Sequence, residues 1–320
     1  MLLEVGNLVI DIAAERVVNG LSFSLDDGGS LGVVGESGSG KTMTALALMG
    51  LAPETARVSG SIRFEGRQLV GLAEEAMRAL RGDRIAMIFQ EPMTALNPLH
   101  RVGAQVAEPL ILHRGMSKAA AFERAVNLLE HVRLADPERA AHAYPFALSG
   151  GERQRAMIAM AIGCSPRLVI ADEPTTALDV TVQARILELI DGLRKESAMA
   201  LLLVSHDLAV IAGHCDRVIV MYAGVIMESG PVGAILRDPR NPYTRALLEA
   251  RPEPGGRRGA RLKAIPGSPP AHHEVGLGCP FAGRCELTLD LCRAKPPPEI
   301  AFGAERMSRC HRAREVGRTA

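Results

Sequence analysis

A glycine-rich segment near the N-terminus has the residue types and the spacing of a phosphate-binding loop. It fits the pattern G-x-x-x-x-G-K-[ST], and its residues are Gly35, Glu36, Ser37, Gly38, Ser39, Gly40, Lys41 and Thr42. The glycines would let backbone N–H groups turn toward phosphate oxygens, and the N-terminus of a following helix would add positive potential. Lys41 would reach the β and γ phosphates, and the Thr42 hydroxyl would ligate Mg²⁺. A turn that binds nothing would not need the apolar run at 31–34 before it or the apolar helical segment after it.

Two carboxylates follow an apolar run farther along the chain. Residues 168–171 are small or apolar, and Asp172 and Glu173 come directly after them. Ligands bind at the carboxyl ends of the strands in a parallel sheet. We expect Asp172 to hold Mg²⁺ and Glu173 to orient and deprotonate the attacking water. His206 ends another apolar run, where it would contact the γ-phosphate; the alternative is an ordinary polar residue at a strand end.

Short apolar runs alternate with segments of helical period along most of the chain. They are rich in Val, Ile and Leu and cover residues 31–34, 85–89, 168–171, 200–204 and 218–221. Buried parallel strands have this composition, so the runs predict an α/β domain in which the polar motifs follow strand ends. Between Gln90 and Leu148 helical patterns occur without strands, which predicts a helical insertion into that domain.

The composition changes near residue 250. Residues 251–320 hold 9 of the 20 prolines and 4 of the 6 cysteines, so we expect one domain at 1–250 and a short extension at 251–320. The chain has 37 Lys and Arg against 36 Asp and Glu, a balance that does not favour binding to nucleic acid. Its longest uncharged stretches run 12 residues, whereas a membrane-spanning helix needs about 20 apolar residues. No secretory signal opens the chain, so we expect a cytoplasmic protein.

Residues 148–155 resemble the signature sequence of the ATP-binding cassette family, and the other motifs fall into that family's order. After the phosphate loop come Gln90, then Ser149, Gly150 and Gly151 of the signature, then Asp172 and Glu173, then Asp179, and finally His206. The resemblance covers residues 2–250. It implies an α/β P-loop nucleotide-binding domain with a helical subdomain at about residues 91–160, which binds and hydrolyses ATP with Mg²⁺.

The same resemblance implies roles for the motif residues. Glu173, His206 and Gln90 would be catalytic, and Gln90 would also join Thr42 and Asp172 in binding Mg²⁺. Asp179 would bind nucleotide, and the signature would contact nucleotide held by the phosphate loop of another cassette. A helix that begins at the signature directs free N–H groups and its positive dipole end outward, which suits an anion. Two ATPase subunits, identical or sister chains, would therefore form the working site.

Three further segments resemble peptide and nickel importers of this family, at residues 90–98, 171–183 and 241–248. They imply a peripheral ATPase subunit on the cytoplasmic face of the inner membrane. Its partners would be a second ATPase subunit, two transmembrane permease subunits and, indirectly, an extracytoplasmic solute-binding protein, but no nucleic acid. The alternative is a DNA-repair or ribosome-associated ATPase of the same family. The 57 residues between Gln90 and Leu148 leave no room for the coiled coil of a repair clamp, and ribosomal factors generally carry two cassettes rather than one.

Four cysteines gather in the extension. Cys279, Cys285, Cys292 and Cys310 are separated by 5, 6 and 17 residues. Such a group in a cytoplasmic protein favours a metal site, but no Cys-x-x-Cys pair is present, which counts against a zinc ribbon. Some peptide-importer cassettes have a similar pattern and hold a 4Fe-4S cluster, so the resemblance ranks a cluster above Zn²⁺ and Zn²⁺ above free thiols. Cys164 and Cys215 lie in apolar segments and are expected in the core.

Overall fold

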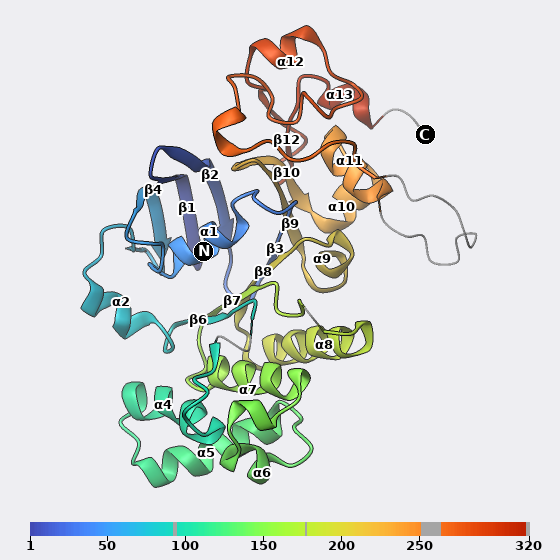
Figure 1. The fold of residues 1–320 in the computed structure, drawn as a ribbon. Helices are drawn as coiled ribbons and strands as arrows, with labels where there is room; N and C mark the ends of the chain where they lie inside the picture. The colour runs from blue at the N-terminus through green and yellow to red at the C-terminus, as the bar shows by residue number, and fades with distance from the viewer. Residues whose placement is uncertain (92–94, 177, 251–263, 318–320) are drawn as a thin grey trace. The chain divides into compact units, whose positions relative to one another are not determined.

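The computed structural model describes residues 1–91, 95–176, 178–250 and 264–317 (Figure 1). The internal contacts divide the chain into two compact units. Unit 1 comprises Met1–Leu3, Ser24–Ser30 and Phe64–Val204, and unit 2 comprises Glu4–Phe23, Leu31–Arg63 and Ser205–Ala320. The expected start of the extension at residue 251 lies outside the described residues, as do residues 92–94 after Gln90. No helix in the described part of the chain is long and apolar enough to span a membrane.

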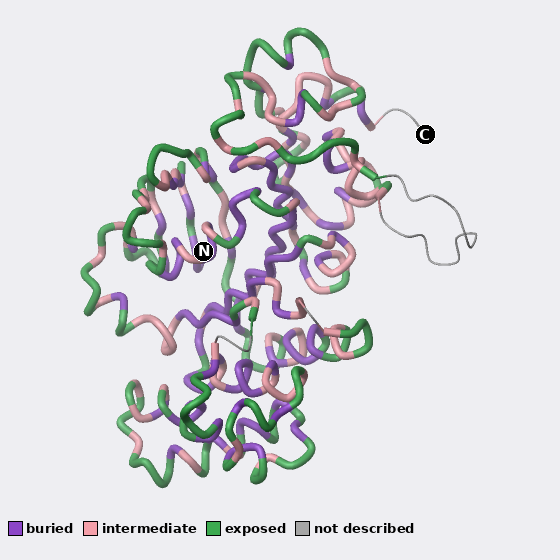
Figure 2. Tube along the Cα trace, viewed as in Figure 1, coloured by how far each residue is buried: buried purple, intermediate pink, exposed green. Residues whose placement is uncertain are grey.

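Three parallel strands lie at the centre of unit 1, in the order β8-β7-β6. They are β6 (Ile85–Ile88), β7 (Leu168–Asp172) and β8 (Ala200–Ser205). Ile88 pairs with Ala171, and Asp172 pairs with Val204. Every residue of these strands is buried (Figure 2), which is why each appears in the sequence as a continuous apolar run.

The helices of unit 1 include a bundle that follows β6 in the chain. Helices α4, α5, α6 and α7 pack on one another, and no strand occurs between residues 102 and 162. Helix α5 buries Ala121, Ala125, Leu128 and Leu129, a spacing that places them on one helical face. The bounds are α2 (Glu74–Leu80), α4 (Val102–Arg114), α5 (Lys118–His131), α6 (Pro137–His142), α7 (Gly150–Ile162) and α8 (Val180–Ser197).

Unit 2 contains a mixed sheet in the order β11-β12-β10-β9-β3. Strands β3 and β9 are parallel, whereas β10 is antiparallel to both β9 and β12. The bounds are β3 (Ser30–Val34), β9 (Arg217–Tyr222), β10 (Val225–Pro231), β11 (Glu299–Ala301) and β12 (Met307–Arg309). The helices are α1 (Lys41–Leu48), α9 (Leu208–His214), α10 (Val232–Arg237), α11 (Pro242–Glu249), α12 (Asp290–Ala294) and α13 (Ala313–Val316).

A second sheet runs through the N-terminal residues. It has the order β2-β1-β4, with β1 (Leu3–Ile12), β2 (Glu15–Leu25) and β4 (Ala56–Phe64). The short strand β5 (Arg67–Gln68) follows β4 in the chain. Exposed and intermediate residues interrupt the buried positions of these strands, so they lack the continuous apolar runs that marked the five strands expected from the sequence.

The C-terminal residues are built into the sheet of unit 2. Strand β12 pairs with β10, so that Ser308 lies opposite Glu228. The buried Glu228 carboxylate accepts a hydrogen bond from Arg306 at 2.9 Å, and burial raises its pKa. The amide of Asn241 donates to the carbonyl oxygens of Met227 and Arg309, at 3.0 and 3.1 Å. The segment after residue 264 is therefore held by backbone pairing and by buried polar contacts.

Candidate nucleotide site

The phosphate loop joins β3 to α1 in unit 2. Gly40 precedes the helix with φ +94°, a conformation that other residues rarely adopt. A Cβ at Gly35 would clash with the carbonyl oxygen of Met221 on the neighbouring strand β9. The loop therefore needs glycine at both positions. Its exposed residues are Ser37, Gly38 and Thr42.

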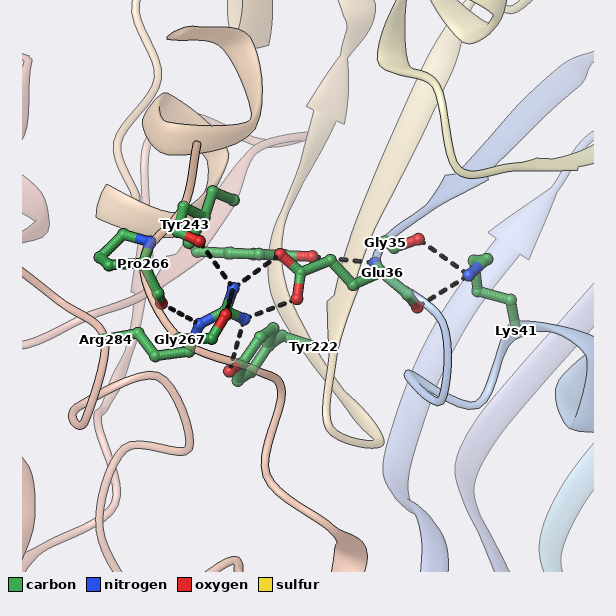
Figure 3. Close-up of polar contacts among 9 residues, drawn as sticks. Gly35, Glu36, Lys41, Tyr222, Tyr243, Pro266, Gly267 and Arg284 are labelled. Carbon is green, nitrogen blue, oxygen red and sulfur yellow. Dashed lines mark hydrogen bonds and ion pairs between the residues drawn. The ribbon is translucent and has the colours of Figure 1, made fainter. Parts of the chain in front are cut away.

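Lys41 is buried, and its ammonium closes the loop. Its Nζ donates to the carbonyl oxygens of Gly35 and Glu36, at 2.8 and 2.9 Å (Figure 3). It also lies 3.5 Å from Ser39 Oγ. An ammonium has three protons to donate. Lys41 must therefore exchange or share at least one present partner when it binds a phosphate oxygen. The same contacts hold its charge at the mouth of the loop before the ligand arrives.

Glu173 and Gln90 meet at the ends of adjacent strands in unit 1. Because Ile88 pairs with Ala171, the residues that follow the two strands come together, and Gln90 Nε2 lies 3.4 Å from Glu173 Oε2. The same oxygen accepts a hydrogen bond from Thr176 Oγ1 at 3.0 Å. Glu173 has φ +43°, an uncommon conformation that often marks functional positions. Its carboxylate is thus fixed by two donors.

Asp172 ends β7 and is 2% exposed. Carboxylate and hydroxyl oxygens are ligands that suit Mg²⁺, so the donor types of Asp172 and Thr42 fit that ion. Thr176 was not singled out from the sequence. Its position three residues after Glu173 is the signal that could have identified it. In the structure the two residues lie in one turn, where the Thr176 N–H also donates to the Glu173 carbonyl oxygen at 3.2 Å.

The signature residues form the N-terminus of helix α7. Ser149 caps the helix: its Oγ accepts from Glu152 N–H at 3.3 Å, and Glu152 Oε2 accepts from Ser149 N–H at 2.8 Å. This hydrogen bond from the backbone helps to lower the pKa of Glu152, as does Arg139, whose Nη2 lies 2.6 Å from Glu152 Oε1. Ser149 and Gly150 are exposed. A well-ordered helix start is therefore presented to solvent.

The remaining motif residues lie at two other helix starts. Asp179 caps α8, and its Oδ1 accepts from the N–H groups of Thr181 and Val182 at 3.1 and 3.0 Å. His206 is exposed between β8 and α9, where Asp207 caps α9. Unit 1 thus contains Gln90, the signature, Asp172, Glu173 and Asp179, whereas unit 2 contains the phosphate loop and His206.

The four cysteines of the extension surround one small cavity in unit 2. Cys279, Cys285, Cys292 and Cys310 line it together with Phe281 and Leu287, and none of the four forms a disulfide. Burial and the neighbouring thiols raise the pKa of Cys279 to about 12 and that of Cys310 to about 11. Among the described residues, no group of three or more His, Cys, Asp or Glu is arranged to hold a metal ion. The expected core cysteines, Cys164 and Cys215, are indeed buried.

These features together define an ATPase domain that binds nucleotide. They are a glycine-rich loop between a strand and a helix, carboxylates at a strand end, and an exposed capped helix. A profile described as "ABC transporter" matches residues 18–176, and one described as "Oligopeptide/dipeptide transporter, C-terminal region" matches residues 227–292. The chain belongs to the ATP-binding cassette transporter family of ATPases, in the branch that carries this C-terminal region.

Individual relatives agree with that assignment. The oligopeptide transport ATP-binding protein OppD of Salmonella typhimurium is 48% identical over 97% of this chain and 93% of its own length. A probable peptide ABC transporter ATP-binding protein, y4tR of Sinorhizobium fredii, is 49% identical over 94% of this chain and 90% of its own. Among solved structures, a dimeric post-hydrolysis state of the ATP-binding cassette MJ0796, bound to ADP and Pi, has a TM-score of 0.64 and 28% identity, covering 72% of this chain and 98% of that one.

Proposed function

We propose that this chain binds and hydrolyses ATP to power the import of di- or oligopeptides, or of nickel, through partner membrane permeases. The observation that carries the proposal is the match of residues 227–292 to the C-terminal region of oligopeptide and dipeptide transporters. The relatives at 48 and 49% identity are named for oligopeptide and peptide transport. These names favour transport over the alternative, a DNA-repair or ribosome-associated ATPase of the same family.

Each motif residue has a role in the proposed reaction. The phosphate loop holds the triphosphate, with Lys41 on the β and γ phosphates. Thr42, Gln90 and Asp172 would hold Mg²⁺, which would neutralise phosphate charge when bound. Glu173 accepts a proton from the attacking water, and the hydrogen bonds from Gln90 and Thr176 fix that carboxylate in place. His206 contacts the γ-phosphate and stabilises its developing charge.

The proposed assembly contains a second ATPase subunit, identical or a sister chain. The start of α7, with Ser149, Gly150 and Gly151, then contacts ATP held by the phosphate loop of the partner, and Asp179 also binds nucleotide. A helix N-terminus with free N–H groups suits the γ-phosphate. Two permease subunits carry the cargo across the membrane, and an extracytoplasmic solute-binding protein delivers it. The chain is then peripheral, on the cytoplasmic face of the inner membrane.

Uptake by whole cells tests the proposed cargo. Deleting the gene for this chain in its host should lower uptake of a labelled tri- or pentapeptide at least tenfold, and the wild-type gene should restore it. The Glu173→Gln variant, expressed at the same level, should not restore it. Labelled Ni²⁺ measured in parallel distinguishes the two cargo classes. Unchanged uptake of both peptides and nickel would contradict the proposed transport function.

We also propose that the four thiolates of the extension hold a 4Fe-4S cluster, with Zn²⁺ as the alternative. The support is the cavity that all four cysteines line. The resemblance to peptide-importer cassettes with a similar cysteine pattern ranks the cluster above Zn²⁺. Binding would release thiol protons, since the raised pKa values keep Cys279 and Cys310 protonated at neutral pH.

Purification without oxygen tests this proposal. The protein should be brown and contain about four irons per chain, the content of a cubane cluster. Cys292→Ser should lose the colour, while Cys164→Ser, a buried cysteine of unit 1, should keep it. Zinc without iron would favour the alternative. A colourless protein without either metal, whose four thiols in the extension all react with an alkylating reagent, would show that these cysteines are free.

A further inference from the structure

Arg284, in the C-terminal extension, contacts the phosphate loop directly. Its Nη1 lies 2.6 Å from Glu36 Oε2 and its Nη2 lies 3.2 Å from Glu36 Oε1, so the guanidinium binds both oxygens of one carboxylate (Figure 3). Paired hydrogen bonds between two charged groups are among the stronger and more directional polar contacts in proteins. Glu36 is the second residue of the phosphate loop, 248 positions before Arg284. Nothing in the motif itself requires this partner.

The contact is partly buried and is supported by further contacts to Arg284, unlike an ordinary surface ion pair. The side chains of Arg284 and Glu36 are 9% and 21% exposed. Arg284 also donates to Tyr222 OH at 3.2 Å and to the carbonyl oxygen of Pro266 at 2.8 Å. Its Cζ lies 5.8 Å from the ring centroid of Tyr222 and 6.0 Å from that of Phe281. The guanidinium is therefore held in one orientation before any ligand binds.

Glu36 is held at its backbone as well as at its carboxylate. Its N–H donates to Tyr243 OH at 3.0 Å, and its carbonyl oxygen accepts from Lys41 Nζ at 2.9 Å. Burial raises the pKa of Tyr243, so its hydroxyl stays neutral. Tyr243 packs against Tyr222 and Phe281, with ring centroids 4.6 and 5.1 Å away. A continuous chain of contacts thus runs from the extension through Glu36 to the lysine of the phosphate loop.

The charges explain why this chain of contacts matters. A carboxylate beside a phosphate site repels the ligand and competes for its lysine. In the structure Arg284 neutralises the Glu36 carboxylate, while the Lys41 ammonium donates to the carbonyl oxygen of the same residue. Without Arg284, the Glu36 carboxylate would keep its negative charge on the phosphate loop without the guanidinium that now neutralises it.

We propose that the C-terminal extension sets the affinity of the phosphate loop for MgATP, with Arg284 as the positioning residue that neutralises the Glu36 carboxylate and fixes it in place. This inference rests on the proposed role of Lys41 in binding the phosphates. The extension is then a working part of the nucleotide site. Any change that displaces Arg284 weakens nucleotide binding without touching the catalytic carboxylate Glu173.

Nucleotide binding by the full-length chain tests the proposal. Arg284→Gln should raise both the Kd and the KM for MgATP about tenfold, the scale of a lost charge-assisted contact, and leave kcat within about twofold. Adding Glu36→Gln should bring the affinity back to within about threefold of the wild type, because the unneutralised charge is then gone. A purely structural role for Arg284 would not give this rescue. Tyr243→Phe keeps the ring packing but removes the acceptor of the Glu36 N–H, and it should weaken binding about fivefold.

Arg306→Gln is the matched control. Arg306 is also a buried arginine of the extension, 10% exposed, but it pairs with Glu228 rather than with the phosphate loop. It should lower thermal stability and leave MgATP affinity within about twofold. Wild-type affinity in folded Arg284→Gln and Tyr243→Phe variants, or the absence of rescue by Glu36→Gln, would overturn the inference. Wild-type chain that binds no MgATP, or Lys41→Ala that binds it normally, would instead contradict the proposed function.

Discussion

Replacing Glu173 with Gln is expected to lower ATP turnover by about two to four orders of magnitude, the usual scale for the loss of a general base. The amide has the shape of the carboxylate, and its oxygen can still accept from Gln90 and Thr176, which now bond to Glu173 Oε2. It cannot take a proton from water. MgATP should therefore still bind, with a Kd within about threefold of the wild type, while steady-state phosphate release falls. Phosphate release and nucleotide titration measure the two effects separately.

Glu188→Gln is the control for this variant. Glu188 is an exposed residue of α8, outside every motif, and its replacement should leave turnover unchanged. With hydrolysis blocked, Glu173→Gln should also accumulate as an ATP-bound dimer in size-exclusion chromatography. Adding Ser149→Arg should abolish that dimer, because the larger arginine side chain would lie at the start of α7, where the partner's ATP is proposed to bind. Normal turnover in Glu173→Gln would rule out its role as the base.

Lys41→Ala should act earlier, on nucleotide binding itself. The ammonium supplies charge-assisted contacts to the phosphates, and losing one such contact corresponds to about a tenfold to hundredfold weaker Kd. The variant also removes the donor to the carbonyl oxygens of Gly35 and Glu36, so the loop should lose its closed shape. Calorimetric or fluorescence titration with MgATP measures the affinity. Thermal unfolding without nucleotide should show that the substitution changes the stability of the fold less than it changes the affinity for MgATP.

A second lysine separates this effect from a general loss of positive charge. Lys195 lies on α8, is 66% exposed and pairs with Asp191 at 2.7 Å. Lys195→Ala should bind MgATP like the wild type, because Lys195 lies outside the motif. Its exposed ion pair contributes about 0.2–1 kcal/mol to stability. Lys41→Ala and Lys195→Ala with the same affinity would contradict the assignment of Lys41 to the phosphates.

The sequence by itself determined the α/β fold class and its family. Five buried strands could be predicted because each is a run of apolar residues with no alternation, and β3, β6, β7, β8 and β9 confirm them. The phosphate loop could be predicted from the sequence because its glycines, lysine and threonine lie within one short segment of the chain. The strands β1, β2 and β4 were missed because their exposed faces interrupt the apolar pattern.

Only the tertiary structure decided which distant residues meet. Gln90 and Glu173 are neighbours because β6 and β7 pair in one particular register, and Thr176 completes the contact through a turn. The composition near residue 250 predicted a separate extension, yet its Arg284 lies against Glu36 and its strand β12 pairs with β10. Local patterns report whether a residue is buried and in which kind of element it lies. The choice between partners far apart in sequence depends on packing and charge, which no local pattern records.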